Sequence, residues 1–357
     1  MSVQLRIVLD QAVHVVDADQ ARAGLALAAG LVQTAPRGCV VGAIVPSGAD
    51  LQVPGVQDVR MLPLGRRELA GAWQLGITPG VGGGLIHAPS LMAPLVRHDR
   101  VHDNDQTTVT LWDLDAWDAS NGMSKTTVAW QKAMLKRAVR HADAVVVPTH
   151  TMAERLADIA RLSDRIRVVA GAAPTGFAQP SDAGVRRQDL QLPERYVVVT
   201  GDVESAAVGF RAAARSDIDV VVLDAADGAE PQWADAAAAV GLPERRAHVR
   251  GKLANADRAA VLGGAAALIA TSTHAAWPWR AVEAMSLGVP LIAVDTGAHR
   301  DVIADGGMLV SASEVVDALE DALGAGEQRL RVLASDRSRA FSWASSAERI
   351  WALHADL

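Results

Sequence analysis

The sequence has little cysteine, little tyrosine or phenylalanine, and no long apolar run. Its 357 residues include 1 cysteine, Cys39, which excludes an internal disulfide framework and a multi-cysteine zinc site. No stretch reaches the roughly 18 uninterrupted apolar residues that a membrane-spanning helix needs. The formal net charge is −7, so the basic face that displaces phosphate counterions from nucleic acid is not expected. These absences argue against nucleic acid as a partner.

What is present indicates a packed intracellular protein. A chain of 357 residues is long enough for about two domains, and 50% of it is hydrophobic and 21% charged. The N-terminal residues lead directly into an apolar strand pattern and do not resemble a signal peptide. We therefore expect a reducing, cytoplasmic location and an inert core thiol at Cys39. High alanine and arginine usage is typical of a bacterial protein from a GC-rich genome.

Short apolar runs alternate with longer amphipathic segments, which predicts parallel sheets covered by helices on both faces. A segment rich in glycine and proline, Gly171–Gly184, predicts a linker, and the pattern restarts after it. The expected strands are Leu5–Leu9, Cys39–Val45, Gly84–His87, Thr107–Leu111, Ala144–Val147, Arg165–Val169, Tyr196–Thr200, Val220–Leu223, Ala247–Val249, Ala267–Ala270 and Leu291–Val294. The expected helices include Asp19–Gln33, Lys125–His141, Met152–Ala160, Ala256–Leu262 and Ala281–Leu287.

One segment, Ser272–Pro290, carries a motif made of Glu283-Ala-Met, Gly288 and Pro290. This segment resembles the donor-site motif of the family 4 retaining glycosyltransferases, and weaker matches follow the family's order along nearly the whole chain. The resemblance implies an α/β protein of the GT-B fold, with two Rossmann-like doubly wound lobes facing an interlobe cleft. It implies an acceptor-side lobe at residues 1–170 and a donor-side lobe at 171–340. Residues 341–357 would form a C-terminal helix that crosses back to the first lobe.

The sequence departs from the family pattern where the chemistry would be. The position of the family's catalytic-site histidine is Trp112, and the first glutamate of the motif is Ala275. Gly201 is retained after the first strand of the second lobe, but the two cations that would clamp the donor diphosphate fall on Asp202 and Val208. Losing one preorganised group that stabilises developing charge costs about 2.7–4 kcal/mol. The resemblance therefore predicts lost or strongly reduced sugar transfer, with catalytic residues unknown.

Several residues remain as donor-site candidates. Glu283 would hold ribose hydroxyls by the resemblance, or serve as a carboxylate near the start of a helix. Lys252, Arg280 and His274 would supply a rearranged anion site, or be ordinary surface charges. No cofactor or metal site is expected, and the ligand implied by the resemblance is a nucleotide-diphosphate sugar. Asp103, Asp105, Asp113, Asp115 and Asp118 are interpreted as a solvated acidic patch.

Two further groups of side chains have two interpretations each. The tryptophans Trp112, Trp117, Trp277 and Trp279 would stack on a sugar or base, or fill space and form a partner surface. A basic face on the expected helix 125–141 would be merely solvated, or would dock on the inner face of an anionic membrane. That face is formed by Lys132, Lys136, Arg137 and Arg140.

Three functions are compatible with these features. The first is an accessory subunit of bacterial glycan or glycoconjugate assembly that supports an active glycosyltransferase partner or forms a homo-oligomer, and binds a glycan or glycolipid. The second is an active retaining glycosyltransferase with a rearranged diphosphate site. The third is a sugar-nucleotide epimerase, which would need acid and base side chains of which the first lobe offers few.

Overall fold

The computed structural model describes residues 3–118 and 120–357, which form two compact units. The sequence places the division after residue 170 and assigns the segment His274–Trp277 to the second lobe. In the structure, the first unit runs to Gly171 and also contains His274–Trp277 and Ser342–Leu357. The second unit consists of Ala172–Thr273 and Pro278–Phe341. Both units are therefore discontinuous in sequence.

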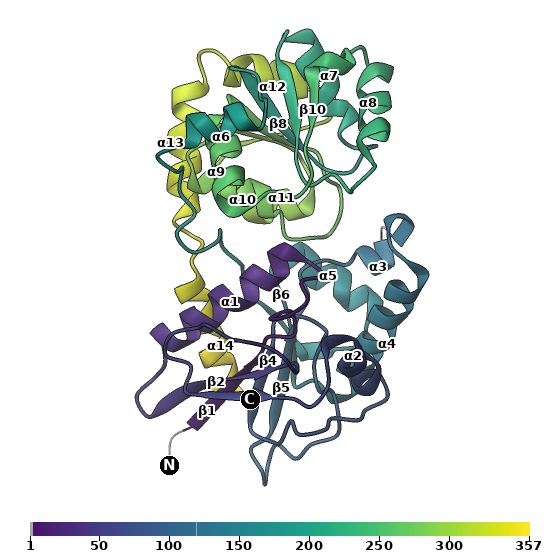
Figure 1. The fold of residues 1–357 in the computed structure, drawn as a ribbon, viewed down its shortest axis with the longest axis vertical. Helices are drawn as coiled ribbons and strands as arrows, with labels where there is room; N and C mark the ends of the chain where they lie inside the picture. Colours follow the sequence, from purple (N-terminus) through teal and green to yellow (C-terminus); the bar gives the residue numbers. More distant parts are fainter. Residues whose placement is uncertain (1–2, 119) are drawn as a thin grey trace. The chain divides into compact units, whose positions relative to one another are not determined.

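A parallel sheet with the strand order β3-β2-β1-β4-β5-β6-β7 forms the centre of the first unit (Figure 1). β2 is the uncharged run CVVGAIV, and a parallel strand covered on both faces favours such a run. β3 lies at one edge and all four of its residues are exposed. The strands are β1 (Val3–Val8), β2 (Cys39–Val45), β3 (Asp58–Met61), β4 (Leu85–Ala88), β5 (Gln106–Thr110), β6 (Ala144–Val147) and β7 (Ile166–Val168).

Helices connect these strands, and four of them begin at a polar side chain that accepts hydrogen bonds from the first turn. The capping residues are Asp17, Ser124, Thr149 and Ser342. The helices of this unit are α1 (Ala18–Gln33), α2 (Arg66–Gln74), α3 (Asp115–Asp118), α4 (Lys125–His141), α5 (His150–Ile159) and α14 (Trp343–Asp356). Short 3-10 turns lie at Ser120–Gly122 and Ser163–Arg165.

The C-terminal helix α14 packs along α1, as Figure 1 shows with the yellow and purple helices. Close approach depends on Gly30 of α1, because a Cβ there would lie 2.6 Å from the carbonyl oxygen of Trp343. The Trp351 indole donates a hydrogen bond to the carbonyl oxygen of Leu31 (3.1 Å), and the Ser346 hydroxyl donates one to Ala170 (2.7 Å). The predicted return of this helix to the first lobe is confirmed.

A buried polar network lies where α14 meets the sheet. The Thr108 hydroxyl of β5 is 2.8 Å from His87 Nδ1 and 3.1 Å from His354 Nε2, and His354 Nδ1 is 2.7 Å from Gln106 Oε1. Burial lowers the pKa of His87 to about 3 and that of His354 to about 4. Both imidazoles are therefore neutral in the folded protein at neutral pH.

The second unit contains a parallel sheet with the strand order β10-β9-β8-β11-β12-β13. Its strands are β8 (Tyr196–Thr200), β9 (Asp219–Val222), β10 (Ala247–Val249), β11 (Ala267–Ala270), β12 (Leu291–Val294) and β13 (Met308–Val310). Its helices are α6 (Ala183–Asp189), α7 (Ala207–Arg215), α8 (Glu230–Ala239), α9 (Asn255–Gly264), α10 (Trp279–Ser286), α11 (Gly297–Ile303), α12 (Val315–Ala322) and α13 (Glu327–Ser338), with a 3-10 turn at Glu244–Arg246.

Each unit has its own hydrophobic core. In the first unit the core includes Leu95, Met134 and Leu156, and in the second it includes Phe210, Ile269 and Leu319. In the part of the chain that the structure describes, no helix is both long and apolar enough to cross a membrane.

The predicted strands agree with the structure to within two residues at each end, but some elements were missed. The strands β3 and β13 were not predicted, nor were α2, which follows β3, and α11, which precedes β13. Helix α6 begins at Ala183, within the last residues of the predicted linker. Two side-chain interpretations are wrong. Asp103 and Asp105 precede β5 whereas Asp113, Asp115 and Asp118 follow it, so they do not form one patch. Arg137 does not belong to a solvated face, because its guanidinium donates a hydrogen bond to the carbonyl of Leu95.

Candidate functional site

Four loops of the second unit follow parallel strands and meet at one edge of its sheet. Two of them carry predicted candidates, and the other two carry residues next to predicted candidates. Gly201 follows β8, Asp224 follows β9, Lys252 follows β10 and Thr271 follows β11. The carboxyl ends of parallel strands share an edge, and ligands of open α/β sheets bind outside that edge. This edge is therefore the candidate donor site.

The turn after β8 is closed by a pair of side chains. The backbone N–H of Asp202 donates to the Ser205 hydroxyl (3.1 Å), and the N–H of Ser205 donates to the Asp202 carboxylate (2.8 Å). This reciprocal arrangement is that of a capping box ahead of α7. Gly201 has φ +150°, and a Cβ there would lie 2.3 Å from the Thr271 hydroxyl, so the turn requires glycine. Asp202 thus organises the backbone at the place where the resemblance expects a cation.

The other clamp position is also occupied by a structural residue. Val208 lies on α7 and packs, partly buried, against the core of the second unit. Neither of the two positions therefore carries a positive charge.

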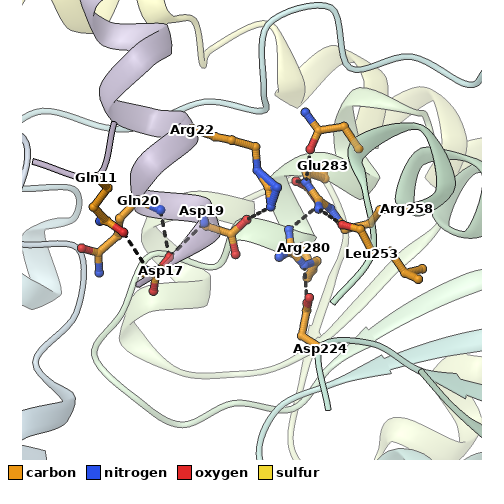
Figure 2. A network of polar contacts seen from close by, with 11 residues as sticks. Gln11, Asp17, Asp19, Gln20, Arg22, Asp224, Leu253, Arg258, Arg280 and Glu283 are labelled. Carbon is orange, nitrogen blue, oxygen red and sulfur yellow. Dashed lines mark hydrogen bonds and ion pairs between the residues drawn. The ribbon is translucent and has the colours of Figure 1, made fainter. Parts of the chain in front are cut away.

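Glu283 lies at the centre of a buried ionic network in the second unit (Figure 2). Its carboxylate accepts two hydrogen bonds from Arg258, at 2.9 and 2.7 Å, and one from Arg280 at 2.7 Å. Arg280 also donates to the Asp224 carboxylate at 2.7 Å. The side chains of Arg258 and Glu283 are both only 1% exposed. Two arginines on one carboxylate form the short, charge-assisted geometry that stabilises a buried charge.

This geometry corrects one interpretation and constrains another. Glu283 is the fifth residue of α10, so it is not a carboxylate at the start of a helix. Both of its carboxylate oxygens already accept hydrogen bonds from arginines. Contact of Glu283 with a ribose stays a prediction. Arg280 is buried in the same network, whereas Lys252 is exposed on the loop after β10.

The segment His274–Trp277 follows β11 in sequence but forms part of the first unit. The N–H of Leu114 donates to the carbonyl of Ala275 (3.1 Å), and that of Trp277 donates to Trp112 (2.8 Å). Asp113 and Ala276 form an antiparallel bridge between these two contacts. The Ala275 side chain packs against the hydrophobic core of the first unit. The position of the motif's first glutamate is thus held in an apolar environment.

Two of the predicted tryptophans fill space in the first unit. Trp112 and Trp277 are buried, and a Cβ on Gly171 would lie 2.9 Å from one ring and 3.1 Å from the other. The Trp112 indole donates to the carbonyl of Pro89 (3.0 Å), and its ring lies edge-on to Trp343 with centroids 6.2 Å apart. His274, beside them, lies 3.7 Å from the Asp115 carboxylate. These contacts favour the space-filling interpretation for Trp112 and Trp277.

A cavity of about 800 Å³ lies in the first unit at the carboxyl edge of β1, β4 and β5. Three tryptophans, Trp112, Trp117 and Trp130, contribute aromatic surface to it. Polar groups come from the loop after β1, where Gln11 accepts hydrogen bonds from the backbone N–H groups of Val16 and Asp17. Figure 2 shows Gln11 beside Asp17. The side chain of Gln11 thus organises the loop after β1, which contains no glycine.

The charged groups that line this cavity are three carboxylates, Asp17, Asp113 and Asp115, and two arginines, Arg66 and Arg67. Asp10 forms an ion pair with Arg66 at 2.8 Å, and Asp113 accepts a hydrogen bond from Gln20 at 3.2 Å. Burial and the neighbouring Asp115 raise the pKa of Asp113 to about 7. Gln20 and Arg66 were not predicted as site residues from the sequence. The signal for such residues is their place directly after strand ends or in the first turn of the following helix.

Comparisons with known proteins agree with this architecture. Residues 205–325 match the family described as glycosyl transferases group 1. Apart from His274–Trp277, the matched residues lie in the second unit. The D-inositol 3-phosphate glycosyltransferase of Nocardia farcinica is 30% identical in an alignment of 239 residues that covers 60% of this chain and 52% of that protein. The chain therefore spans about half the length of this relative.

Two solved structures are similar over almost the whole chain. Sucrose-phosphate synthase of Thermosynechococcus elongatus has a TM-score of 0.69 at 18% identity, covering 99% of this chain and 98% of that one. The Anabaena protein HepE in complex with UDP and glucose has a TM-score of 0.69 at 16% identity, covering 99% and 100%. At this level of identity the likeness shows the fold, and the predicted GT-B fold is confirmed.

Proposed function

We propose that this chain belongs to bacterial glycan or glycoconjugate assembly, where it has lost most or all sugar transfer and acts as an accessory subunit of an active glycosyltransferase. The observation that carries the proposal is the turn after β8. At the two positions where the resemblance expects diphosphate-binding cations, Asp202 caps the turn and Val208 packs into the core. Asp202 stabilises the turn and Val208 stabilises the core, and a lysine or arginine at these positions would not fill those roles.

The electrostatic consequence is large. A nucleoside diphosphate gains negative charge as it leaves the sugar, and removing one group that stabilises such charge costs about 2.7–4 kcal/mol. The carboxylate of Asp202 at this edge adds repulsion. The effects of losing several groups are not additive, but each loss acts in the same direction. Ala275, packed against the first unit's core, supplies no carboxylate for a donor sugar.

The cavity of the first unit supports a binding role. Its volume of about 800 Å³ lies in the range of small-molecule sites. Tryptophan faces together with amide and carboxylate groups suit a polyhydroxylated sugar ring, which presents both apolar C–H and hydroxyl surfaces. We therefore expect the chain to retain glycan or glycolipid binding after losing the standard donor site.

Titration calorimetry with a panel of nucleotide sugars tests the loss of donor binding. UDP-glucose, UDP-N-acetylglucosamine, ADP-glucose and GDP-mannose would be titrated, with a catalytically active group 1 enzyme as the positive control. We expect no binding in the micromolar range and no transfer to glycan acceptors. Micromolar binding together with product formation would overturn the proposal.

Lys252 motivates a second candidate, an active retaining enzyme with a rearranged diphosphate site. Lys252 is exposed at the candidate donor edge, and it makes no hydrogen bond or ion pair with other residues that the structure describes. Under this alternative, the wild-type protein binds a nucleotide sugar and Lys252→Ala weakens binding by about tenfold or more. Lys132→Ala, which removes an exposed lysine from α4, is the matched control.

Copurification from the native host tests the accessory role. We expect a second glycosyltransferase with an intact donor motif at equal stoichiometry. Recovery of this chain alone, as a monomer or homo-oligomer with measurable transfer activity, would contradict the role.

A further inference from the structure

A second cavity of the first unit lies away from the carboxyl-edge cavity. Its volume is about 560 Å³, and its walls come from the segments that precede β5, β6 and β7 and from the end of α14. These segments meet at the amino ends of the parallel strands. One cavity therefore lies at the amino ends of the strands of this sheet, and the other lies at their carboxyl ends.

The walls of this cavity are strongly basic, although the whole chain has a net charge of −7. Two histidines, His98 and His141, contribute imidazoles. The pKa of His141 is lowered first by burial and then by Arg137, His98 and Arg140, which fits a positive potential at this place. Five guanidinium groups line the same space, namely Arg97, Arg100, Arg140, Arg165 and Arg167.

Three carboxylates in the lining offset only part of the charge of its five arginines, and Asp99 lies near Arg97 outside the lining. Asp143 already accepts hydrogen bonds from the N–H of Thr107 and from His98 Nε2, both at 2.8 Å, and lies 4.0 Å from Arg100. The Asp143 carboxylate therefore already has hydrogen-bond and charge partners within the cavity wall. Asp164 and Asp356 are exposed at the rim, where water screens their charge.

The arginines divide into fixed and available groups. Arg165 donates to the carbonyls of Ala142 and Val139, both at 2.8 Å, and so forms a rigid part of the wall. Arg97 and Arg140 make no hydrogen bond or ion pair within residues 3–118 and 120–357, and both are exposed toward solvent. Their donors are available to a ligand that enters the cavity.

We propose that this amino-edge cavity binds a phosphate group, with Arg97 and Arg140 as the main ligands and Arg165 as the fixed wall behind them. Guanidinium forks match the geometry of phosphate oxygens, and a dianion relieves the repulsion among the clustered cations. The volume accommodates a phosphorylated small molecule or a phospholipid headgroup. The site is independent of the proposed donor and acceptor chemistry, because it uses the other edge of the sheet.

Calorimetry with inorganic phosphate tests the site at about 0.15 M salt, which screens weak surface attraction. The test variant is Arg97→Ala/Arg140→Ala, and both side chains are exposed, so folding should be retained. The control is Lys136→Ala, which removes an exposed charge from the same helix one turn before Arg140 but outside the cavity. We expect the double variant to weaken binding by at least about tenfold and the control by less than about twofold.

Sedimentation with phosphatidylglycerol and phosphatidylcholine vesicles distinguishes the two sources of phosphate. Binding of free phosphate with the expected arginine dependence supports a soluble ligand. Binding to phosphatidylglycerol vesicles alone, with the same dependence, supports a lipid headgroup. If the wild type binds neither probe, or if the double variant binds as well as the wild type, the proposal is overturned.

Discussion

Glu283 illustrates how one residue can match a motif and still have its chemistry defined by its neighbours. Its position in the Glu-Ala-Met sequence suggests a ligand contact, but the structure surrounds its carboxylate with Arg258 and Arg280. A buried ion pair can raise or lower the stability of the folded protein, depending on its geometry. Removing only one partner lowers the stability, because it leaves the other charge buried and unpaired. The stability of the second unit therefore depends on this carboxylate.

Glu283→Gln should destabilise the protein by about 3–5 kcal/mol, because it leaves Arg258 buried without a charge partner and leaves Arg280 with Asp224 alone. Urea unfolding followed by circular dichroism measures the change. Glu320→Gln, at an exposed position of α12, is the control and should change the unfolding free energy by less than about 0.5 kcal/mol. A loss below about 1 kcal/mol for Glu283→Gln would contradict a structural role and favour ligand contact.

At single residues, the sequence carries a signal only where partners are local, and the pairing of Arg280 with Glu283 was not among the predictions. Arg280 and Glu283 lie three residues apart on a helix, and this spacing alone predicts that their side chains meet. Arg258 lies on another helix, 25 residues away in sequence, and no local pattern identifies it as the main partner. The capping role of Asp202 was predictable from the serine three residues later, because a polar pair at this spacing is typical of a capped turn.

At the scale of elements, the contact between α1 and α14 depends on the absence of a side chain at Gly30. The nearest atoms to an added Cβ belong to backbone, the carbonyl group of Trp343, and cannot rotate away. Replacing glycine by alanine within a helix normally stabilises the protein. At Gly30, packing against the Trp343 backbone therefore decides whether the free energy of unfolding rises or falls.

Gly30→Ala should destabilise the first unit by about 1–3 kcal/mol, the usual cost of overpacking. Gly71→Ala in α2 is the matched control, since nothing lies within 4 Å of the added Cβ and the position is exposed. The control should stabilise by about 0.4–1 kcal/mol. Thermal unfolding of both variants measures the effect, and equal shifts in the same direction would refute the packing argument.

The buried imidazoles at the α14 contact predict a loss of stability in acid. The pKa of His354 is about 4 in the folded protein because of burial, against about 6.5 in an unfolded chain. Below pH 6.5 the unfolded state binds a proton that the folded state does not, so the free energy of unfolding falls as the pH drops towards 4. From pH 7 to pH 5 this one group should remove about 2 kcal/mol.

Comparison with His354→Gln isolates this contribution, since Asp113, whose pKa is raised to about 7, acts in the opposite direction in both proteins. Urea unfolding at pH 7 and pH 5 should show a smaller decrease in the variant. His102→Gln, which replaces an exposed histidine, is the control. An identical pH dependence in His354→Gln and wild type would show that the imidazole titrates normally.

Strand prediction succeeded where both faces of a strand are buried. β2 and β6 are continuous apolar runs, and the sequence predicts their bounds as the structure has them. β3 is an exposed edge strand, Asp-Val-Arg-Met, whose composition carries neither an apolar run nor a buried face. α6 was missed because the glycines and prolines before it indicate a linker, while the helix depends on packing against α9.

At the scale of the whole molecule, the first unit is assembled from three separate pieces of the chain. The segment Ser342–Leu357 supplies α14, which buries Trp351 and Ile350 and completes the network at His354. The core of the second unit is formed by residues between Val197 and Leu330 and contains no residue of α14. The two cores therefore differ in their dependence on the C-terminal helix.

A chain that ends at Phe341 should lose the structure of the first unit and keep that of the second. Without α14 the buried face of α1 is exposed, and the Leu31 carbonyl loses the indole of Trp351. Hydrogen exchange with mass spectrometry should show lost protection in β1, β4 and β5 and retained protection in β8 and β11. A chain shortened by only Asp356 and Leu357, which leaves His354 in place, is the control and should keep both. Equal loss of protection in the two sheets would show that the units unfold as one cooperative structure, and unchanged protection in the first sheet would show that α14 is dispensable to its core.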